Sequence, residues 1–178
     1  MDKGTRNLLI TGEPGIGKTT LITKLAAELK ALNPVGFYTA ETRVDGVRKG
    51  FQLVSLDGRH GTLAHVDCRS PIIVGKYRVN VRAFEVFLST LNLTATDGRL
   101  VIIDEIGKME CHSRVFRAEV EELLAQDRIV IATVAQNGTG LIEQVKQRED
   151  TVVFEMMRRN REELLGKVLR RIHQIRFS

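Results

Sequence analysis

The chain has 178 residues, of which 43% are hydrophobic and 28% are charged, a balance typical of a globular protein with one buried core. We therefore expect a single domain over residues 1–178. No stretch approaches the roughly 20 apolar residues of a membrane helix, and the N-terminus lacks a signal-peptide pattern, so we expect no membrane partner and a cytoplasmic location. Two distant cysteines, Cys68 and Cys111, and four histidines without ligand spacing argue against a disulfide framework and a zinc site.

The first predicted unit is a strand, a glycine-rich loop and a helix. Asn7–Thr11 is a short apolar run typical of a buried strand, and residues 18–32 carry apolar side chains at helical spacing. Between them, residues 12–19 read Gly-Glu-Pro-Gly-Ile-Gly-Lys-Thr, a full match to the phosphate-binding (Walker A) pattern G-x-x-x-x-G-K-[ST]. A strand, a tight turn and a helix N-terminus in series direct backbone N–H groups at an anion. The unit is therefore predicted to bind a chain of phosphates.

Each residue type in this segment has a chemical role in binding phosphate or Mg²⁺. Glycines allow backbone angles and close approaches that a Cβ would block. The Lys18 side chain can reach the β- and γ-phosphates, and the Thr19 hydroxyl is a ligand for Mg²⁺. The candidate nucleotide-binding residues here are Gly12, Glu13, Pro14, Gly15, Ile16, Gly17, Lys18, Thr19 and Thr20.

The next segment has a different pattern. A strand is predicted over 35–40, after Asn33-Pro34 ends the first helix. Asp45-Gly46 and Asp57-Gly58 are two turn signals, and residues 50–56 between them alternate partly as a strand. This pattern predicts an antiparallel meander, around 41–66, inserted into the chain.

The remaining residues alternate between helix and strand. The predicted elements are a helix over 79–93, a strand over 100–103, a helix over 113–125, a strand over 128–134, a short helix over 141–147, a strand over 151–155 and a helix over 161–173. Such alternation predicts an α/β fold of three layers, with a mostly parallel sheet and helices on both faces. Ligands of these sheets bind beyond the carboxyl ends of the strands, where the glycine loop lies.

An acidic pair follows the most apolar strand. The run 100–103 is Leu-Val-Ile-Ile, and Asp104 and Glu105 come directly after it. This is the expected (Walker B) position of an aspartate that holds Mg²⁺, so we assign Asp104 to the metal together with Thr19. Glu105 is expected to orient an attacking water or to accept its proton. Lys18 and Glu105 are therefore the predicted catalytic residues.

Phosphoryl transfer also gains from further positive charge, because the transition state spreads negative charge over the phosphate oxygens. The sequence does not choose among the candidates for this role, which are Lys108, Arg43, Arg78, Arg117 and Arg161.

These motifs together resemble the THEP1 family of nucleoside triphosphatases. The similarity rests on residues 12–20, on the string Ile103-Asp104-Glu105-Ile106-Gly107-Lys108-Met109-Glu110, and on shorter pieces at 36–39, 74–79 and 160–161. It implies a P-loop NTPase fold and Mg²⁺-dependent hydrolysis of ATP, GTP, CTP and UTP with broad base specificity. The sequence contains no Asn-Lys-x-Asp signature of guanine specificity, which agrees with broad base specificity. The second nucleotide-binding segment that the resemblance implies is Val101, Ile102, Ile103, Asp104, Glu105, Ile106, Gly107 and Lys108.

The chain departs from the family pattern at two places. Ala40-Glu41 stands where the family has two glutamates, and residues 135–140 replace a loop that often contains proline and histidine. A role for either segment in this chain is therefore not carried over, and the glycines of 135–140 suggest a mobile loop.

Two other functions use the same motifs. A nucleotide or small-molecule kinase would bind its acceptor at residues 41–80. An RNA-associated switch would use the basic C-terminal residues. These residues contribute much of the net charge of +5. These residues are Arg158, Arg159, Arg161, Lys167, Arg170, Arg171 and Arg176. We expect a monomer, and we expect the basic face to be solvated rather than bound to nucleic acid.

Overall fold

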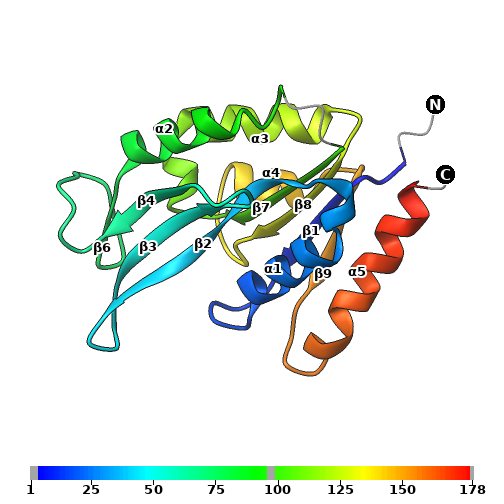
Figure 1. The fold of residues 1–178 in the computed structure, drawn as a ribbon, viewed down its shortest axis with the longest axis horizontal. Helices are drawn as coiled ribbons and strands as arrows, with labels where there is room; N and C mark the ends of the chain where they lie inside the picture. The colour runs from blue at the N-terminus through cyan, green and yellow to red at the C-terminus, as the bar shows by residue number, and fades with distance from the viewer. Residues whose placement is uncertain (1–3, 96–98, 177–178) are drawn as a thin grey trace.

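A computed structural model describes residues 4–95 and 99–176, and within them one sheet of nine strands forms the middle of the molecule (Figure 1). The strand order is β5-β6-β4-β3-β2-β7-β8-β1-β9. The predicted domain of 1–178 also includes residues 1–3, 96–98 and 177–178, which lie outside the described residues.

The half of the sheet that carries the sequence motifs is parallel. Its strands, in spatial order, are β2 (Val35–Val44), β7 (Leu100–Ile106), β8 (Ile129–Val134), β1 (Asn7–Thr11) and β9 (Thr151–Glu155). The carboxyl ends of these strands lie at one edge, so the residues that follow β1 and β7 come close together although the sequence separates them.

Helices cover both faces of this half, as predicted (Figure 1). On one face lie α1 (Lys18–Glu28) and α5 (Arg161–Arg176). On the other lie α2 (Val81–Leu91), α3 (Arg114–Ala125) and α4 (Leu141–Lys146). Successive residues of β7 alternate between the two cores, so both faces of the strand are buried. This explains the continuous apolar run of 100–103.

The other half of the sheet is the predicted antiparallel meander, with two differences. Strand β2 continues to Val44, so the parallel strand and the first meander strand are one element, paired in turn with β3 (Val47–Ser55) and β4 (His60–His65). A hairpin of β5 (Ile73–Val74) and β6 (Tyr77–Val79) then extends the sheet beyond residue 66. Strands of two and three residues are too short to show an alternating pattern, so the sequence did not predict this hairpin.

Several helix and strand ends differ from the prediction for local reasons. α2 begins at Val81 rather than at 79, because the Asn80 side chain accepts a hydrogen bond from the Ala83 N–H at 3.0 Å and caps the helix. α1 ends at Glu28 and gives way to the 3₁₀ turn η1 (Lys30–Leu32). β7 runs three residues further than predicted, to Ile106, so Asp104 and Glu105 belong to the strand. A second 3₁₀ turn, η2 (Glu110–His112), follows it.

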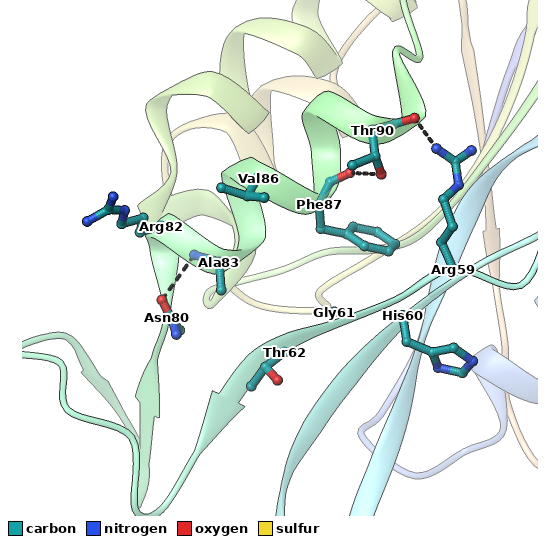
Figure 2. Close-up of a pocket in the computed structure, with 10 residues that line it drawn as sticks. All are labelled: Arg59, His60, Gly61, Thr62, Asn80, Arg82, Ala83, Val86, Phe87 and Thr90. Carbon is teal, nitrogen blue, oxygen red and sulfur yellow. Dashed lines mark hydrogen bonds between the residues drawn. The ribbon is translucent and has the colours of Figure 1, made fainter.

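The meander also has a surface hollow of about 580 Å³ between β4 and α2 (Figure 2). Gly61 of β4 faces the Phe87 ring of α2 there, and Arg59 reaches across to the carbonyl oxygen of Thr90 (Figure 2). Strands β3 and β2 separate β4 from β7, so this hollow is not the place where the Walker motifs meet.

No helix among the described residues is long and apolar enough to cross a membrane.

Candidate active site

The loop after β1 is shaped by glycines and held by a neighbouring segment. Gly12, Gly15 and Gly17 have φ values of 153°, 78° and 112°, which favour glycine. A Cβ on Gly12 would lie 2.5 Å from the carbonyl oxygen of Met156, and the Met156 N–H donates a 2.7 Å hydrogen bond to the Thr11 carbonyl. The segment after β9 therefore packs against the start of the loop and fixes its position.

Lys18 begins α1 and folds back over this loop. Its side chain is almost fully buried, and Nζ donates to the carbonyl oxygens of Gly12 at 2.9 Å and Glu13 at 3.3 Å. The same Nζ lies 3.7 Å from Oε2 of Glu105. The two residues predicted to be catalytic are thus brought together, and the ammonium group lies where the loop meets the end of β7.

Asp104 is the most strongly held side chain of the site. It is 1% exposed, and its Oδ2 accepts hydrogen bonds from the Thr19 hydroxyl at 2.7 Å and the Thr39 hydroxyl at 3.3 Å. Its Oδ1 accepts a 2.5 Å bond from the hydroxyl of the buried Thr133. Donors from α1, β2 and β8 therefore orient one carboxylate of β7, as a buried charge requires.

The sequence did not predict Thr39 and Thr133 as site residues. Thr133 stands near the carboxyl end of β8, whereas Thr39 lies in the middle of β2, just after the residues that pair with β7. Both strands are direct neighbours of β7, in the spatial order β2-β7-β8. Threonine is common in strands, so only the strand order reveals that these two hydroxyls face Asp104.

The donor set around Asp104 fits Mg²⁺. Thr19 and Asp104 supply a hydroxyl and a carboxylate oxygen 2.7 Å apart, and hard cations prefer oxygen ligands. Among the described residues no group of three or more histidine, cysteine and acidic side chains is placed to hold a metal. Mg²⁺ needs no such cage, since it is usually bound by one or two protein groups, substrate phosphates and water.

The environment of Glu105 suits a proton acceptor. Burial raises the pKa of its carboxyl, the charge of Lys18 lowers it, and the charge of Asp104 raises it again. A carboxylate with a raised pKa is a stronger base than one in water. The register between β7 and β8 slips between Ile103 and Ile106, where Glu105 lies, and the Asp104–Glu105 peptide bond is cis.

Glu110 is a second carboxyl beside Glu105 that the sequence did not assign. It is 5% exposed, and burial, together with the charge of Glu105, raises its pKa to about 8. A Cβ added to Gly107 would lie 2.7 Å from Glu110 Oε2 and 2.9 Å from Glu105 Oε1, so both carboxyl groups pack against this glycine. Glu110 closes the string of residues that carries the family resemblance, but nothing in its spacing indicates burial.

The other residues of the second predicted nucleotide-binding segment fall into two groups. Val101, Ile102, Ile103 and Ile106 are buried in the two cores, where they fix the position of Asp104 and Glu105. Gly107 and the exposed Lys108 form the turn that follows β7.

Of the arginines considered as additional cations, one lies beside the phosphate loop. The Arg161 Cδ is 3.8 Å from the position of a Cβ on Gly17. Arg43 instead binds Glu41, with its Nη2 2.6 Å from Oε2, and Arg78 donates to the carbonyl of Ser70 at 2.8 Å. Arg117 lies in α3, on the other face of the sheet.

A glycine loop between β1 and α1, joined to an acid at the end of β7 in a sheet covered on both faces, defines a P-loop nucleotide-binding protein of the α/β class. The comparisons with known proteins narrow this class. The family model described as NTPase matches residues 7–169, and the chain belongs to this family of nucleoside triphosphatases.

Two relatives and two solved structures illustrate the similarity. The nucleoside-triphosphatase THEP1 of Thermotoga sp. (strain RQ2) is 46% identical over 163 residues, which cover 91% of this chain and 92% of that protein. The human cancer-related nucleoside-triphosphatase is 38% identical, with 92% and 95% covered.

The crystal structure of THEP1 from Aquifex aeolicus superposes with a TM-score of 0.83 at 32% identity, covering 91% of this chain and 96% of that one. The solution structure of a human cancer-related nucleoside triphosphatase gives 0.81 at 34% identity, with 95% and 98% covered. The predicted family and fold class are confirmed.

Proposed function

We propose that this protein hydrolyses nucleoside 5′-triphosphates to the diphosphate and phosphate, that it requires Mg²⁺, and that it accepts ATP, GTP, CTP and UTP. One observation carries the proposal. The ammonium group of Lys18 lies 3.7 Å from Glu105, the neighbour of an Asp104 that is bonded to Thr19 at 2.7 Å. A phosphate-binding cation, a metal-binding pair and a carboxylate base therefore converge at one point. The names of the relatives support the same reaction.

Different residues of the site have different roles in the proposed hydrolysis. The backbone N–H groups of the glycine loop and the first turn of α1 bind the phosphates, and Lys18 exchanges its bonds to the Gly12 and Glu13 carbonyls for phosphate oxygens. Thr19 and Asp104 would hold Mg²⁺, which when bound supplies positive charge to the β- and γ-phosphate oxygens. Thr39 and Thr133 keep the Asp104 carboxylate oriented. Glu105 accepts the proton of the water that attacks the γ-phosphorus.

The kinase alternative is less well supported. A kinase needs a site for its acceptor within reach of the γ-phosphate. The hollow of about 580 Å³ in the meander lies between β4 and α2, and β3 and β2 intervene between β4 and Asp104 on β7. Water is the acceptor that needs no such site, so hydrolysis is the simpler function of this arrangement.

The RNA-associated alternative is also less well supported. Some of the C-terminal basic residues pair locally, since Arg161 Nε lies 3.3 Å from Glu162 and Lys167 Nζ 3.4 Å from Glu163. The absence of bound nucleic acid, a monomeric state and a cytoplasmic location stay predictions.

Phosphate release tests the proposal. We expect Mg-ATP, Mg-GTP, Mg-CTP and Mg-UTP each to give one phosphate per nucleotide with no added acceptor, and EDTA to stop the reaction. Phosphate that leaves only by stoichiometric transfer to an added nucleoside would show a kinase instead.

A further inference from the structure

A second hollow, of about 260 Å³, adjoins the phosphate loop. One side is formed by Gly17, Leu21 and Lys24 at the start of α1, and the other by Met156, Arg161 and Leu165 from the segment after β9 and from α5. We propose that this hollow binds the nucleobase of the triphosphate by stacking against the guanidinium group of Arg161. The inference rests on the proposed function, because it concerns the substrate of that reaction.

The hollow begins where the phosphates are expected. Gly17 is the N-cap of α1, and a Cβ placed on it would lie 3.6 Å from Cε of Met156 and 3.8 Å from Cδ of Arg161. Two of the side chains that line the hollow, Met156 and Arg161, therefore lie directly beside the rim of the phosphate loop. A nucleoside that leaves the loop along this rim enters the hollow at once.

The lining suits a flat aromatic group. Leu21 is 4% exposed and Met156 is 3% exposed, so they provide an apolar floor. Arg161 stands at the solvent side with its side chain 54% exposed, and its Nε is held 3.3 Å from the Glu162 carboxylate. A planar guanidinium stacks in parallel on aromatic faces, whereas a lysine ammonium group interacts with them only as a point charge.

The same lining explains why one base would not be preferred. Among the described residues of the hollow, the side chains that can donate or accept hydrogen bonds are those of Thr20, Lys24, Arg161 and Glu162, and all of these residues are exposed. Buried polar groups are what reject a wrong base, since they lose their partners when it binds. Stacking alone is tolerant because every base has an aromatic face.

Hydrogen bonds hold the turn that leads into α5, the helix that begins with Arg161. Asn160 stabilises the turn that precedes α5, because its Nδ2 donates to the Glu155 carbonyl at 2.8 Å and its Oδ1 accepts from the Met157 N–H at 2.8 Å. The Met156 N–H is bonded to Thr11, next to the phosphate loop. Hydrogen bonds thus connect the segment that lines the proposed base site to the start of the phosphate loop.

Substitution of Arg161 tests the proposal by kinetics. In Arg161→Ala we expect the KM for each of the four Mg-nucleotides to rise about tenfold, with kcat changed less than twofold. Arg161→Lys keeps the charge but not the plane, so it should behave like the alanine variant. The control is Arg159→Ala, an exposed arginine of the preceding turn that does not line the hollow, and we expect its kinetics to match the wild type.

Calorimetry with Mg-tripolyphosphate, which has no base, separates stacking from phosphate contact. We expect its Kd to be the same in Arg161→Ala and in the wild type. An equal loss of affinity for tripolyphosphate and for nucleotides would make Arg161 a phosphate ligand and overturn the proposal, as would unchanged nucleotide KM values.

A spectroscopic probe gives an independent test that needs no turnover. The chain contains no tryptophan, so Leu165→Trp places a single tryptophan, which can be excited selectively, in the hollow. We expect Mg-ATP to change its emission strongly and Mg-tripolyphosphate to leave it unchanged. If neither the wild type nor any variant releases phosphate but Mg-ATP still changes the tryptophan emission, the hydrolysis proposal fails while the base site stands. No response to any nucleotide that calorimetry shows to be bound would contradict the base site.

Discussion

Thr19 and Asp104 are 85 residues apart in the sequence, yet the Thr19 hydroxyl donates a 2.7 Å hydrogen bond to Oδ2 of Asp104. The contact exists because β7 lies two strands from β1 in the sheet order β7-β8-β1, so the helix that follows β1 reaches the carboxyl end of β7. The pair joins the two halves of the proposed nucleotide site, and we expect the donors around Asp104 to determine how well it is oriented for Mg²⁺.

The Thr133 hydroxyl is expected to stabilise both the fold and the metal site. Thr133→Val removes the donor to Asp104 Oδ1 from a fully buried position and leaves a carboxylate oxygen without its partner. We expect a loss of about 1–3 kcal/mol in the free energy of unfolding, measured with urea, and a several-fold increase in the Mg²⁺ concentration needed for half-maximal turnover.

Thr151→Val is the matched control, because the buried Thr151 hydroxyl of β9 makes no hydrogen bond in the structure. This variant should unfold at the same urea concentration as the wild type or a higher one. Equal destabilisation by both substitutions would mean that the contact between Thr133 and Asp104 contributes nothing specific.

Lys18 is expected to be essential for turnover. Lys18→Ala removes the ammonium group that lies on the Gly12 and Glu13 carbonyls and is placed to move to the phosphates. Loss of one such electrostatic contact costs about 10²–10³ in rate, and the pKa of Glu105 should rise further without the lysine charge beside it. Phosphate release gives the measurement, with the exposed Lys30→Ala as control. Turnover of Lys18→Ala within tenfold of the wild type would contradict this role.

The Glu110 carboxyl is expected to make stability fall as pH rises. Its pKa is about 8 in the fold against an ordinary 4.5, so between these values the folded state holds a proton that the unfolded chain has released. The free energy of unfolding therefore decreases with pH over this range, by about 1.4 kcal/mol per unit for one proton, and levels off above it. Urea unfolding in EDTA, without nucleotide, measures this slope.

Glu110→Gln should lose that part of the pH dependence, so the variant gains stability relative to the wild type on going from pH 5.5 to pH 8. Burial also raises the pKa of Glu119, to about 7, in both proteins, so the difference between them is the informative quantity. The exposed Glu121→Gln serves as control. Parallel curves for Glu110→Gln and the wild type would show that the buried carboxyl does not carry the proton.

The sequence predicted what depends on local pattern. The glycine loop, the acid at the end of an apolar strand and the alternation of helix and strand each have a signature of their own, and the fold class follows from them. Thr39, Thr133 and Glu110 have no such signature, because their contacts depend on which strands are neighbours and on how the turn after β7 folds back.

Gly36 is a further position whose structural role the sequence did not predict. A Cβ there would lie 1.8 Å from the carbonyl oxygen of Ile102, a close approach of β2 to β7 that the pairing of the two strands reveals and the sequence does not. The hairpin β5–β6 was missed for a different reason, since its strands are shorter than any periodic pattern.

Hydrolysis at this site depends on Glu105 as the base, and a single-turnover experiment with Glu105→Gln measures that dependence. Glutamine keeps the size of the side chain but cannot accept the proton of the attacking water. We predict that the variant binds Mg-ATP with wild-type affinity, measured by calorimetry, and releases γ-phosphate at least 100-fold more slowly, as expected for loss of a general base (about 10²–10⁴). Phosphate release at the wild-type rate would show that Glu105 is not the base.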